Sequence, residues 1–472
     1  MIQPSRAFRL EHDLLGDMPV PENAYYGIHS LRAMENFPIT GTSIGTCRDL
    51  IVGLAAIKEA AAEANCELGC IDAVSKDAIV AACREIRGGA LHDQFVVDPI
   101  QGGAGTSTNM NANEVIANRA LEIMGFERGE YVRLHPNEHV NFGQSTNDVY
   151  PTALKLAALS AISRLLVSMA NLRLAFDAKA QEFADVLKMG RTQLQDAVPM
   201  TLGQEFGTYA LMLAEDEARL LEASGLIREI NLGGTAIGTG IASHPRYAAL
   251  VRERLSAIVD QDLITAPNLI EATQDCGAFV QLSGVLKRIA VKLSKVCNDL
   301  RLLSSGPRSG FNEINLPPRQ AGSSIMPGKI NPVIPEVVNQ IAFEVIGNDM
   351  TITMAAEAGQ LQLNAFEPII FYSLERSLSH LTAGCETLER HCVRDITANR
   401  DLLRAQVERS IGIVTALNPH IGYQFATEVA VEAHSSGLNV YDIVLSRGLM
   451  TREHLDLVLC PAALTQPSSM LS

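Results

Sequence analysis

One loop of the sequence combines residue types that could take up a proton and bind an anion. Residues 320–336 read QAGSSIMPGKINPVIPE, with Ser323 and Ser324 between glycine residues and a single lysine, Lys329. Hydroxyl groups and one ammonium group suit recognition of a small carboxylate, and a hydroxyl group can act as a base where its pKa is lowered. A static N-cap before the next helix would explain the serines, but it would not explain the glycine pair or the lysine.

Three other segments, here named the polar islands, are rich in small hydroxyl and amide side chains. They read GAGTSTNMNANE from residue 103, HVNFGQSTNDVYPT from residue 139 and KMGRTQLQDAVPMTLGQE from residue 188. Each island joins glycine or proline to these side chains, so we expect each at the start of a helix, where capping is their ordinary role. Three islands and the serine loop together supply the neutral donors that bind small carboxylates at helix N-termini.

The patterns of other catalytic and metal sites are missing from the sequence. No phosphate-binding G-x4-G-K-[ST] or G-x-G-x-x-G pattern occurs in the islands, and no G-x-S-x-G elbow surrounds Ser323. His135 and His139 are four residues apart, but a proline lies between them and the H-E-x-x-H order is absent. Cys66 and Cys70 form a lone pair without a second pair in register. We therefore expect no metal site.

The composition limits the class of protein and its partners. The chain has 472 residues, of which 47% are hydrophobic and 19% charged, so we expect a globular protein of two or three domains. The net charge of −15 and the lack of a basic run argue against nucleic acid and anionic membrane surfaces as partners. An N-terminus without an apolar segment and nine scattered cysteines favour a cytoplasmic protein without a disulfide framework.

The hydrophobic pattern predicts long helices that position these polar segments. We divide the chain into an N-terminal mixed domain (1–142), a central helical-bundle domain (143–399) and a small C-terminal helical domain (400–472). In the central domain, apolar residues follow a heptad pattern, which is typical of a long helix packed along its neighbours. The residues of this seam are Leu282, Leu286, Ile289, Leu293, Val296, Leu300 and Leu303. Residues 204–230 and 337–360 also have helical character, so we predict a bundle. A helical solenoid would need internal repeats at a fixed period, and the sequence has none.

The serine loop and the islands resemble a known family. GSSIMPGKINP is similar to the signature loop of the fumarase/aspartase superfamily, and GTSTNMNANE, QSTNDVYPT and GRTQLQDAVPMTLGQE resemble its other substrate-binding segments in the same order. The resemblance extends over essentially the whole chain. Within the superfamily, AYYGIHSLRAMENF and LRLLSSGPRSGFNEINLP resemble the branch that removes ammonia from aspartate.

The resemblance implies a fold, an assembly and roles for individual residues. It implies a mainly α, three-domain protein whose central bundle of long helices is shared in a homotetramer, with active sites built from several subunits. It also implies a small dicarboxylate substrate, L-aspartate or fumarate, and no cofactor. Ser323 would be the base that takes the C3 proton and leaves an aci-carboxylate intermediate. The residues implied to bind the substrate are Thr106, Ser145, Thr146, Asn147, Thr192, Ser324, Lys329 and Asn331.

One residue departs from part of the family pattern. Fumarases and some aspartases carry histidine where this chain has Gln193, and that histidine pairs with a glutamate that matches Glu336. An amide does not titrate near neutral pH, so Gln193 favours elimination of ammonia over elimination of water. A class II fumarate hydratase and a non-catalytic helical scaffold with the same fold are the two alternatives.

Overall fold

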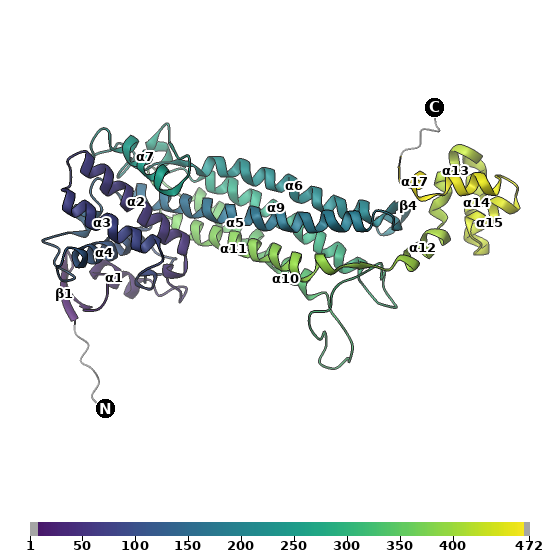
Figure 1. Cartoon of the computed structure of the whole chain (residues 1–472), viewed down its shortest axis with the longest axis horizontal. Coiled ribbons are helices and arrows are strands. Elements are labelled where there is room, and N and C mark those ends of the chain that lie inside the picture. The colour runs from purple at the N-terminus through teal and green to yellow at the C-terminus, as the bar shows by residue number, and fades with distance from the viewer. Residues whose placement is uncertain (1–7, 467–472) are drawn as a thin grey trace. The chain divides into compact units, whose positions relative to one another are not determined.

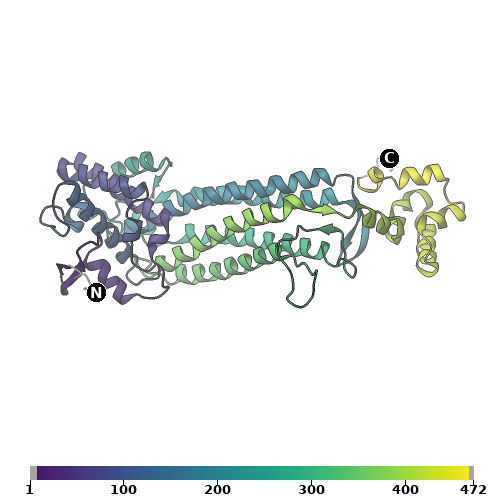
Figure 2. The same cartoon turned by 60° about the horizontal axis from the view of Figure 1, so that its bottom comes forward.

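The computed structural model describes residues 8–466, which form mostly helices and a few short strands (Figure 1). The described chain divides into unit 1, residues 8–166, 218–288 and 343–381, and unit 2, residues 167–217, 289–342 and 382–466. Five long helices lie side by side in Figures 1 and 2. Each of them has one part in unit 1 and the other part in unit 2. They are α5 (Thr146–Glu182), α6 (Leu202–Ile227), α9 (Gly277–Leu303), α10 (Val333–Glu357) and α11 (Glu367–His391). The mainly α fold with a long-helix bundle is confirmed.

The heptad seam predicted between residues 282 and 303 lies on α9. All seven apolar residues of the seam are buried, the most exposed being Leu303 at 5%. The ring of Phe176 on α5 meets Tyr209 of α6 edge-to-face and Phe206 of α6 at a tilt, which adds aromatic contacts between these helices in unit 2. The bundle core therefore follows directly from apolar periodicity along each helix.

Unit 1 packs shorter helices around the N-terminal polar islands. Helix α2 contacts α3, α4 and α7, and α4 also contacts α1 and α3. Its other helices are α1 (Ile28–Asn36), α2 (Arg48–Glu67), α3 (Ala73–Arg87), α4 (Thr106–Ile123), α7 (Tyr247–Val259) and α8 (Leu269–Ala272), with short helices at Ile44–Thr46, His92–Gln94 and Pro136–Val140. Its strands are β1 (Phe8–Asp13), β2 (Gly16–Pro21), β5 (Glu229–Ile230) and β6 (Ile264–Thr265).

Unit 2 contains a β-hairpin and the small C-terminal helices. The hairpin pairs β3 (Leu187–Thr192) with β4 (Gln195–Thr201), and Met189 of β3 is buried in an apolar cluster with Leu417, Val429 and Leu455. Strand β7 (Ile314–Asn315) pairs with β8 (Thr397–Ala398). The C-terminal helices are α12 (Arg400–Arg409), α13 (Val414–Ile421), α14 (Tyr423–Ser436), α15 (Val440–Ser446), α16 (Arg452–Val458) and α17 (Pro461–Leu464), with short helices at Val393–Asp395 and Ile411–Ile413.

One expectation about local structure is wrong. The third polar island was expected at the start of a helix, but most of it forms the hairpin of β3 and β4, and helix α6 begins only at Leu202. The reason is the turn at Gln193 and Leu194, both of which have positive φ (53° and 63°) and fold the chain back on itself. The first two islands do stand at helix starts, those of α4 and α5.

Helix α5 is long and apolar enough, by length and composition, to cross a membrane. Within the chain, 61% of its most apolar 18-residue stretch is buried. Burial of this kind is typical of the central helix of a bundle. The division into three domains at residues 142 and 399 stays a prediction.

Candidate active site

Four of the predicted substrate-binding residues lie at two neighbouring helix starts in unit 1. Thr106 is the first residue of α4, Ser145 precedes α5, and Thr146 and Asn147 open α5. The side chains of the two helices are joined directly, because Asn109 Nδ2 donates to Thr146 Oγ1 at 3.1 Å. Helix N-termini carry partial positive charge, so this place, here named the α4–α5 junction, suits a carboxylate.

The start of α4 depends on a close approach of backbone to an aromatic ring. Gly105 has a φ of +87°, and a Cβ built on it would lie 2.3 Å from the ring of Tyr150 on α5. Tyr150 is itself 1% exposed, so its ring has no room to retreat. Glycine at position 105 therefore sets the distance between Thr106 and the residues that open α5.

We expect Gly105→Ala to lower stability and weaken substrate binding together. The left-handed backbone costs an alanine about 1–2 kcal/mol, and overpacking against the ring adds about 1–3 kcal/mol. Gly103→Ala is the matched control, because Gly103 also has a φ of +87° but its nearest neighbour lies 3.8 Å away. Thermal melts and KM for both variants measure the difference. Equal effects of the two substitutions would show that the contact with Tyr150 has no consequence.

A buried lysine lies behind the α4–α5 junction. Lys58 of α2 is 0% exposed, and its Nζ donates to Asn141 Oδ1 at 2.8 Å and to Gln144 Oε1 at 2.9 Å. Asn109 Nδ2 also donates to Asn141 Oδ1, which links the lysine to the side chains of the junction. Burial lowers the pKa of Lys58 to about 7, while the Asp148 carboxylate opposes that shift. The ammonium form would add favourable charge for a bound dianion.

The first turn of α5 is fixed by the buried carboxylate of Asp148. Asp148 Oδ1 accepts from Ser145 N at 2.9 Å, and Oδ2 accepts from Gly233 N and Thr235 N. Burial raises the pKa of Asp148 to about 6, although the hydrogen bonds from these backbone donors act to lower it. Asn147 Nδ2 donates to Ala236 O at 2.7 Å, so in this structure its amide group tethers the loop after Ile230. Its role in substrate binding stays a prediction.

Thr192 stands at the tip of the β3–β4 hairpin in unit 2. It pairs with Gln195 across a two-residue turn of Gln193 and Leu194, and all four residues are exposed. Positive φ at both central residues is the signature of a type I′ turn, which prefers asparagine and glycine. The strain of placing two larger residues there, about 1 kcal/mol or more each, is typical of functional positions.

The serine loop of unit 2 is closed at its base and exposed at its tip. Gly322 N donates to Lys329 O at 2.7 Å, and Asn331 Nδ2 donates to Gly322 O at 2.7 Å. Ser323 Oγ accepts from Ile325 N at 3.2 Å and from Met326 N at 3.0 Å. Two such N–H groups favour an alkoxide over a neutral hydroxyl group. The side chains of Ser324 and Lys329 are exposed, whereas the amide group of Asn331 braces the loop.

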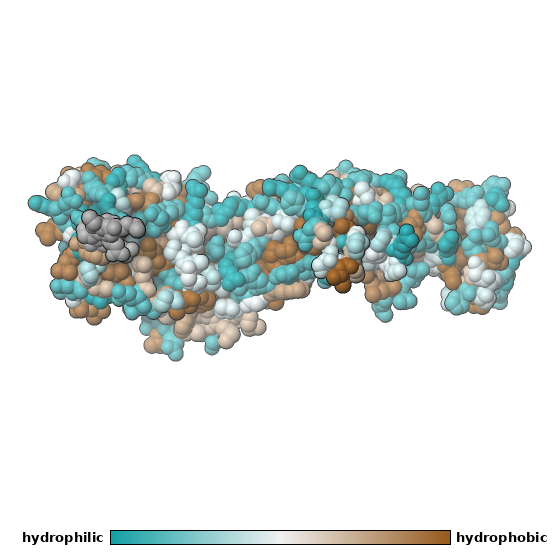
Figure 3. Space-filling model, turned by 90° about the horizontal axis from the view of Figure 1, so that it is seen from below, coloured by the Kyte–Doolittle hydropathy of each residue, from teal (hydrophilic) through white to brown (hydrophobic). Residues whose placement is uncertain are grey.

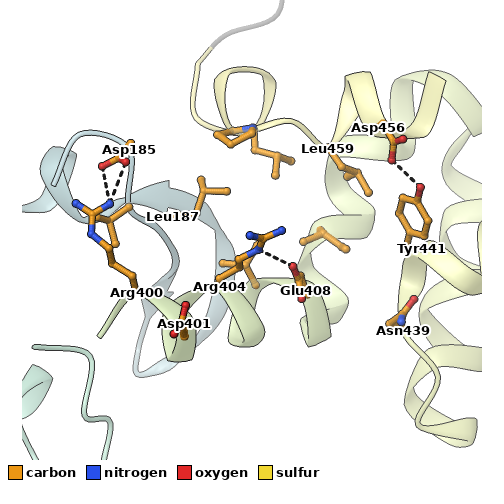
Figure 4. A pocket seen from close by; sticks show the side chains of 15 residues that line it. Asp185, Leu187, Arg400, Asp401, Arg404, Glu408, Asn439, Tyr441, Asp456 and Leu459 are labelled. Carbon is orange, nitrogen blue, oxygen red and sulfur yellow. Dashed lines mark hydrogen bonds and ion pairs between the residues drawn. The ribbon is translucent and has the colours of Figure 1, made fainter. Parts of the chain in front are cut away.

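A separate cavity of about 750 Å³ lies among the C-terminal helices of unit 2 (Figure 4). Both of its guanidinium groups are already paired, Arg400 with Asp185 and Arg404 with Glu408. Apolar side chains such as Leu187 and Leu459 form much of its lining. A cavity whose cations are neutralised suits a dicarboxylate poorly, so we do not assign the active site to it.

The structure thus groups the predicted residues in three places: the α4–α5 junction, the hairpin tip and the serine loop. Lys58 is the supporting residue that the sequence reading missed. A lysine next to Glu59 in an alanine-rich helix is ordinarily exposed, so no local signal marked Lys58 as buried. Among residues 8–466 no cluster of three or more His, Cys, Asp or Glu side chains could hold a metal ion, and the nine cysteines are free thiols.

Comparison with known proteins decides the family. Residues 16–347 match the family described as Lyase, and residues 413–466 match the family described as Fumarase C C-terminus. The chain belongs to the fumarase/aspartase family of lyases. A curated aspartate ammonia-lyase from Helicobacter pylori (strain J99) is 58% identical to this lyase over 97% of the chain and 98% of that protein.

Solved structures share the fold of this lyase over nearly their whole length. The structure of a fumarate lyase:delta crystallin from Brucella melitensis has a TM-score of 0.95 at 53% identity, covering 98% of this chain and 100% of that chain. A class II fumarase from Schistosoma mansoni has a TM-score of 0.93 at 35% identity, with 98% and 100% covered. The predicted family is confirmed, and this lyase is an enzyme. The Helicobacter pylori ammonia-lyase is more similar to this chain in sequence than the Schistosoma mansoni fumarase is, at 58% against 35% identity.

Proposed function

We propose that this lyase catalyses the reversible deamination of L-aspartate to fumarate and ammonia. The observation that carries the proposal is the 58% identity, over 97% of the chain, to a protein named aspartate ammonia-lyase. The chemistry of the three groups of residues agrees with it. They offer neutral donors, one exposed ammonium group and one hydroxyl group with two N–H donors, which match a substrate with two carboxylates.

The first chemical step is removal of a weakly acidic proton next to the side-chain carboxylate of aspartate. Ser323 Oγ, as the alkoxide, takes the C3 proton, and the electron pair moves onto the carboxylate to give a dianionic aci-carboxylate. The donors at Thr106, Ser145 and Thr146 stabilise this developing charge because they are oriented before it arrives. The electron pair then forms the C2–C3 double bond, and nitrogen leaves with the electrons of the C–N bond.

The serine base requires an environment that lowers the pKa of its hydroxyl group. The N–H groups of Ile325 and Met326 point at Ser323 Oγ, and Lys329 is in the same loop. The exposed tip includes Ile325, which is 83% exposed, and could exclude water by covering the substrate. We therefore propose that the serine loop closes as a lid and hinges near Gly328, whose φ of +81° and open surroundings leave it free to move.

The leaving group decides between an ammonia-lyase and a hydratase. The ammonium group of aspartate leaves already protonated, whereas hydroxide leaving from malate needs a proton from the enzyme. Gln193 at the hairpin tip has an acceptor and two donors but does not titrate near neutral pH. It can orient the ammonium group without delivering a proton.

The experiment that tests the proposal measures fumarate by its absorbance with L-aspartate or L-malate as the only substrate. We expect fumarate from L-aspartate and negligible formation from L-malate, because no titratable group stands at position 193. In the reverse direction, fumarate with ammonia should give aspartate. Hydration of fumarate as fast as its amination would defeat the assignment in favour of a fumarase.

We further propose that the chain acts as a cytoplasmic homotetramer in which several subunits build each site. An apolar stripe on α10 supports an assembly: Phe343, Met350 and Met354 are between 62% and 65% exposed, and their spacing places them on one helix face. Apolar patches, brown in Figure 3, interrupt the polar surface. Exposed apolar stripes of this kind mark protein–protein contacts. Nucleic acid and membranes are not expected partners.

A further inference from the structure

A fully buried carboxylate stands at the stem of the serine loop. Glu313 is 0% exposed and directly precedes strand β7, which leads into the segment that carries Ser323. Its backbone is held on both sides: Glu313 N donates to Leu303 O at 2.9 Å, and Asn399 N donates to Glu313 O at 2.9 Å. The stem of the loop is therefore anchored to the end of α9.

The side chain of Glu313 reaches the hairpin that carries Thr192. Lys188 Nζ lies 2.7 Å from Glu313 Oε2, and the Arg191 guanidinium group pairs with Glu313 Oε1. Lys188 also pairs with Glu205 of α6 at 2.6 Å, so two cations face two carboxylates. The Arg191 guanidinium group lies over the ring of Phe311, 4.4 Å from its centroid. Arg191 is the immediate neighbour of Thr192 in the strand.

A β-bulge makes this double contact geometrically feasible. Side chains three residues apart in a regular strand point to opposite faces, so Lys188 and Arg191 would not both face Glu313. Met189 pairs with Pro199 and Arg191 with Asp196, so two residues of β4 lie opposite Gly190 alone, where an added Cβ would lie 3.0 Å from Val198 O. A bulge increases the local twist of the strand pair, and this added twist allows both cations to reach the same carboxylate. Bulges often re-aim side chains beside active sites.

We propose that Glu313 is a positioning residue that fixes the Thr192 hairpin and the stem of the Ser323 loop of the same chain to each other, so that each segment enters its active site at a fixed place. The inference deepens the proposed function and rests on it, because its consequence for catalysis assumes that Thr192 and Ser323 act on the substrate. Glu313 itself does not touch the substrate. A buried charge that loses its partner is costly, so the network stays closed only while all four charged groups are present.

The test replaces the carboxylate by its neutral isostere. Glu313→Gln should lower kcat/KM for L-aspartate about 10- to 100-fold, because a displacement of about 1 Å costs on the order of 10² in rate. In hydrogen exchange without substrate, peptides covering 187–201 and 313–332 should exchange faster. Glu389→Gln is the matched control: Glu389 is 3% exposed and pairs with Arg394 in unit 2, and within residues 8–466 no hydrogen bond or ion pair joins its side chain to the hairpin.

A double mutant distinguishes positioning from a general loss of stability. If Lys188 acts through Glu313, Lys188→Met combined with Glu313→Gln should lose little more activity than Glu313→Gln alone. Should Glu313→Gln fail to fold, Arg191→Lys keeps the charge, loses the planar fork and should give the same local increase in exchange. Unchanged exchange in both segments, or an increase spread over the whole chain, overturns the proposal. Hydrogen exchange needs no turnover, so it remains decisive even if wild-type protein does not deaminate aspartate.

Discussion

Ser323→Ala is expected to lower turnover of L-aspartate about 10²- to 10⁴-fold, the usual cost of losing a positioned general base. The hydroxyl oxygen is the acceptor for the N–H groups of Ile325 and Met326, and no other side-chain oxygen of the loop accepts from two backbone donors. Fumarate absorbance in initial-rate assays measures the effect. Ser309→Ala, an exposed serine in the preceding loop, should keep wild-type activity. A Ser323 variant with more than half of the wild-type rate would exclude Ser323 as the base.

A subunit-exchange experiment tests whether each active site combines segments of different chains. If each site combines the hairpin of one chain with the serine loop of another, mixing inactive Thr192→Ala and Ser323→Ala proteins should restore partial activity. Some sites in a mixed tetramer would then carry neither substitution. If activity does not recover although mass spectrometry confirms that subunits have exchanged, the result would count against shared sites. The role of Ser323 would then be judged from the Ser323→Ala variant alone.

Lys329→Met is expected to reduce kcat/KM for L-aspartate about 10- to 100-fold, mainly through a higher KM. A hydrogen bond to a charged group contributes about 1.5–3 kcal/mol, and each 1.4 kcal/mol corresponds to a factor of ten. Within the described residues no ion pair holds Lys329, so its charge is available to a carboxylate. Steady-state kinetics with L-aspartate measure the change.

Lys329→Arg distinguishes, in the same assay, the contribution of the positive charge from that of the shape of the side chain. Arginine keeps the positive charge but presents a planar fork in place of a compact ammonium group, so part of the affinity should return. Unchanged KM and kcat in Lys329→Met would mean that Lys329 is an ordinary surface residue and that the substrate binds elsewhere.

Local patterns were sufficient to predict the helices α6, α9 and α10 and the helix starts at two of the three islands. The apolar residues of α9 recur with a helical period, which places them on one face that the helix must bury. The seam from Leu282 to Leu303 could therefore be predicted without knowing which helices pack against it. Glycine before Thr106 and the QSTND segment before α5 carry capping signals within a few residues of the helix starts. The hairpin in the third island was not predicted, because its turn contains Gln193 and Leu194 in place of the asparagine and glycine that are typical of such turns.

By itself, the sequence determined the fold class, the family and the residues at the helix starts and in the serine loop, because these depend on short-range periodicity and motif order. Only the tertiary structure decided which side chains support them. Lys58 meets Asn141 more than 80 positions along the chain, and Glu313 meets Lys188 and Arg191 more than 120 positions back. Whether a charge in such a place is buried and paired or exposed and solvated depends on long-range packing, and no local pattern in a single chain encodes that difference.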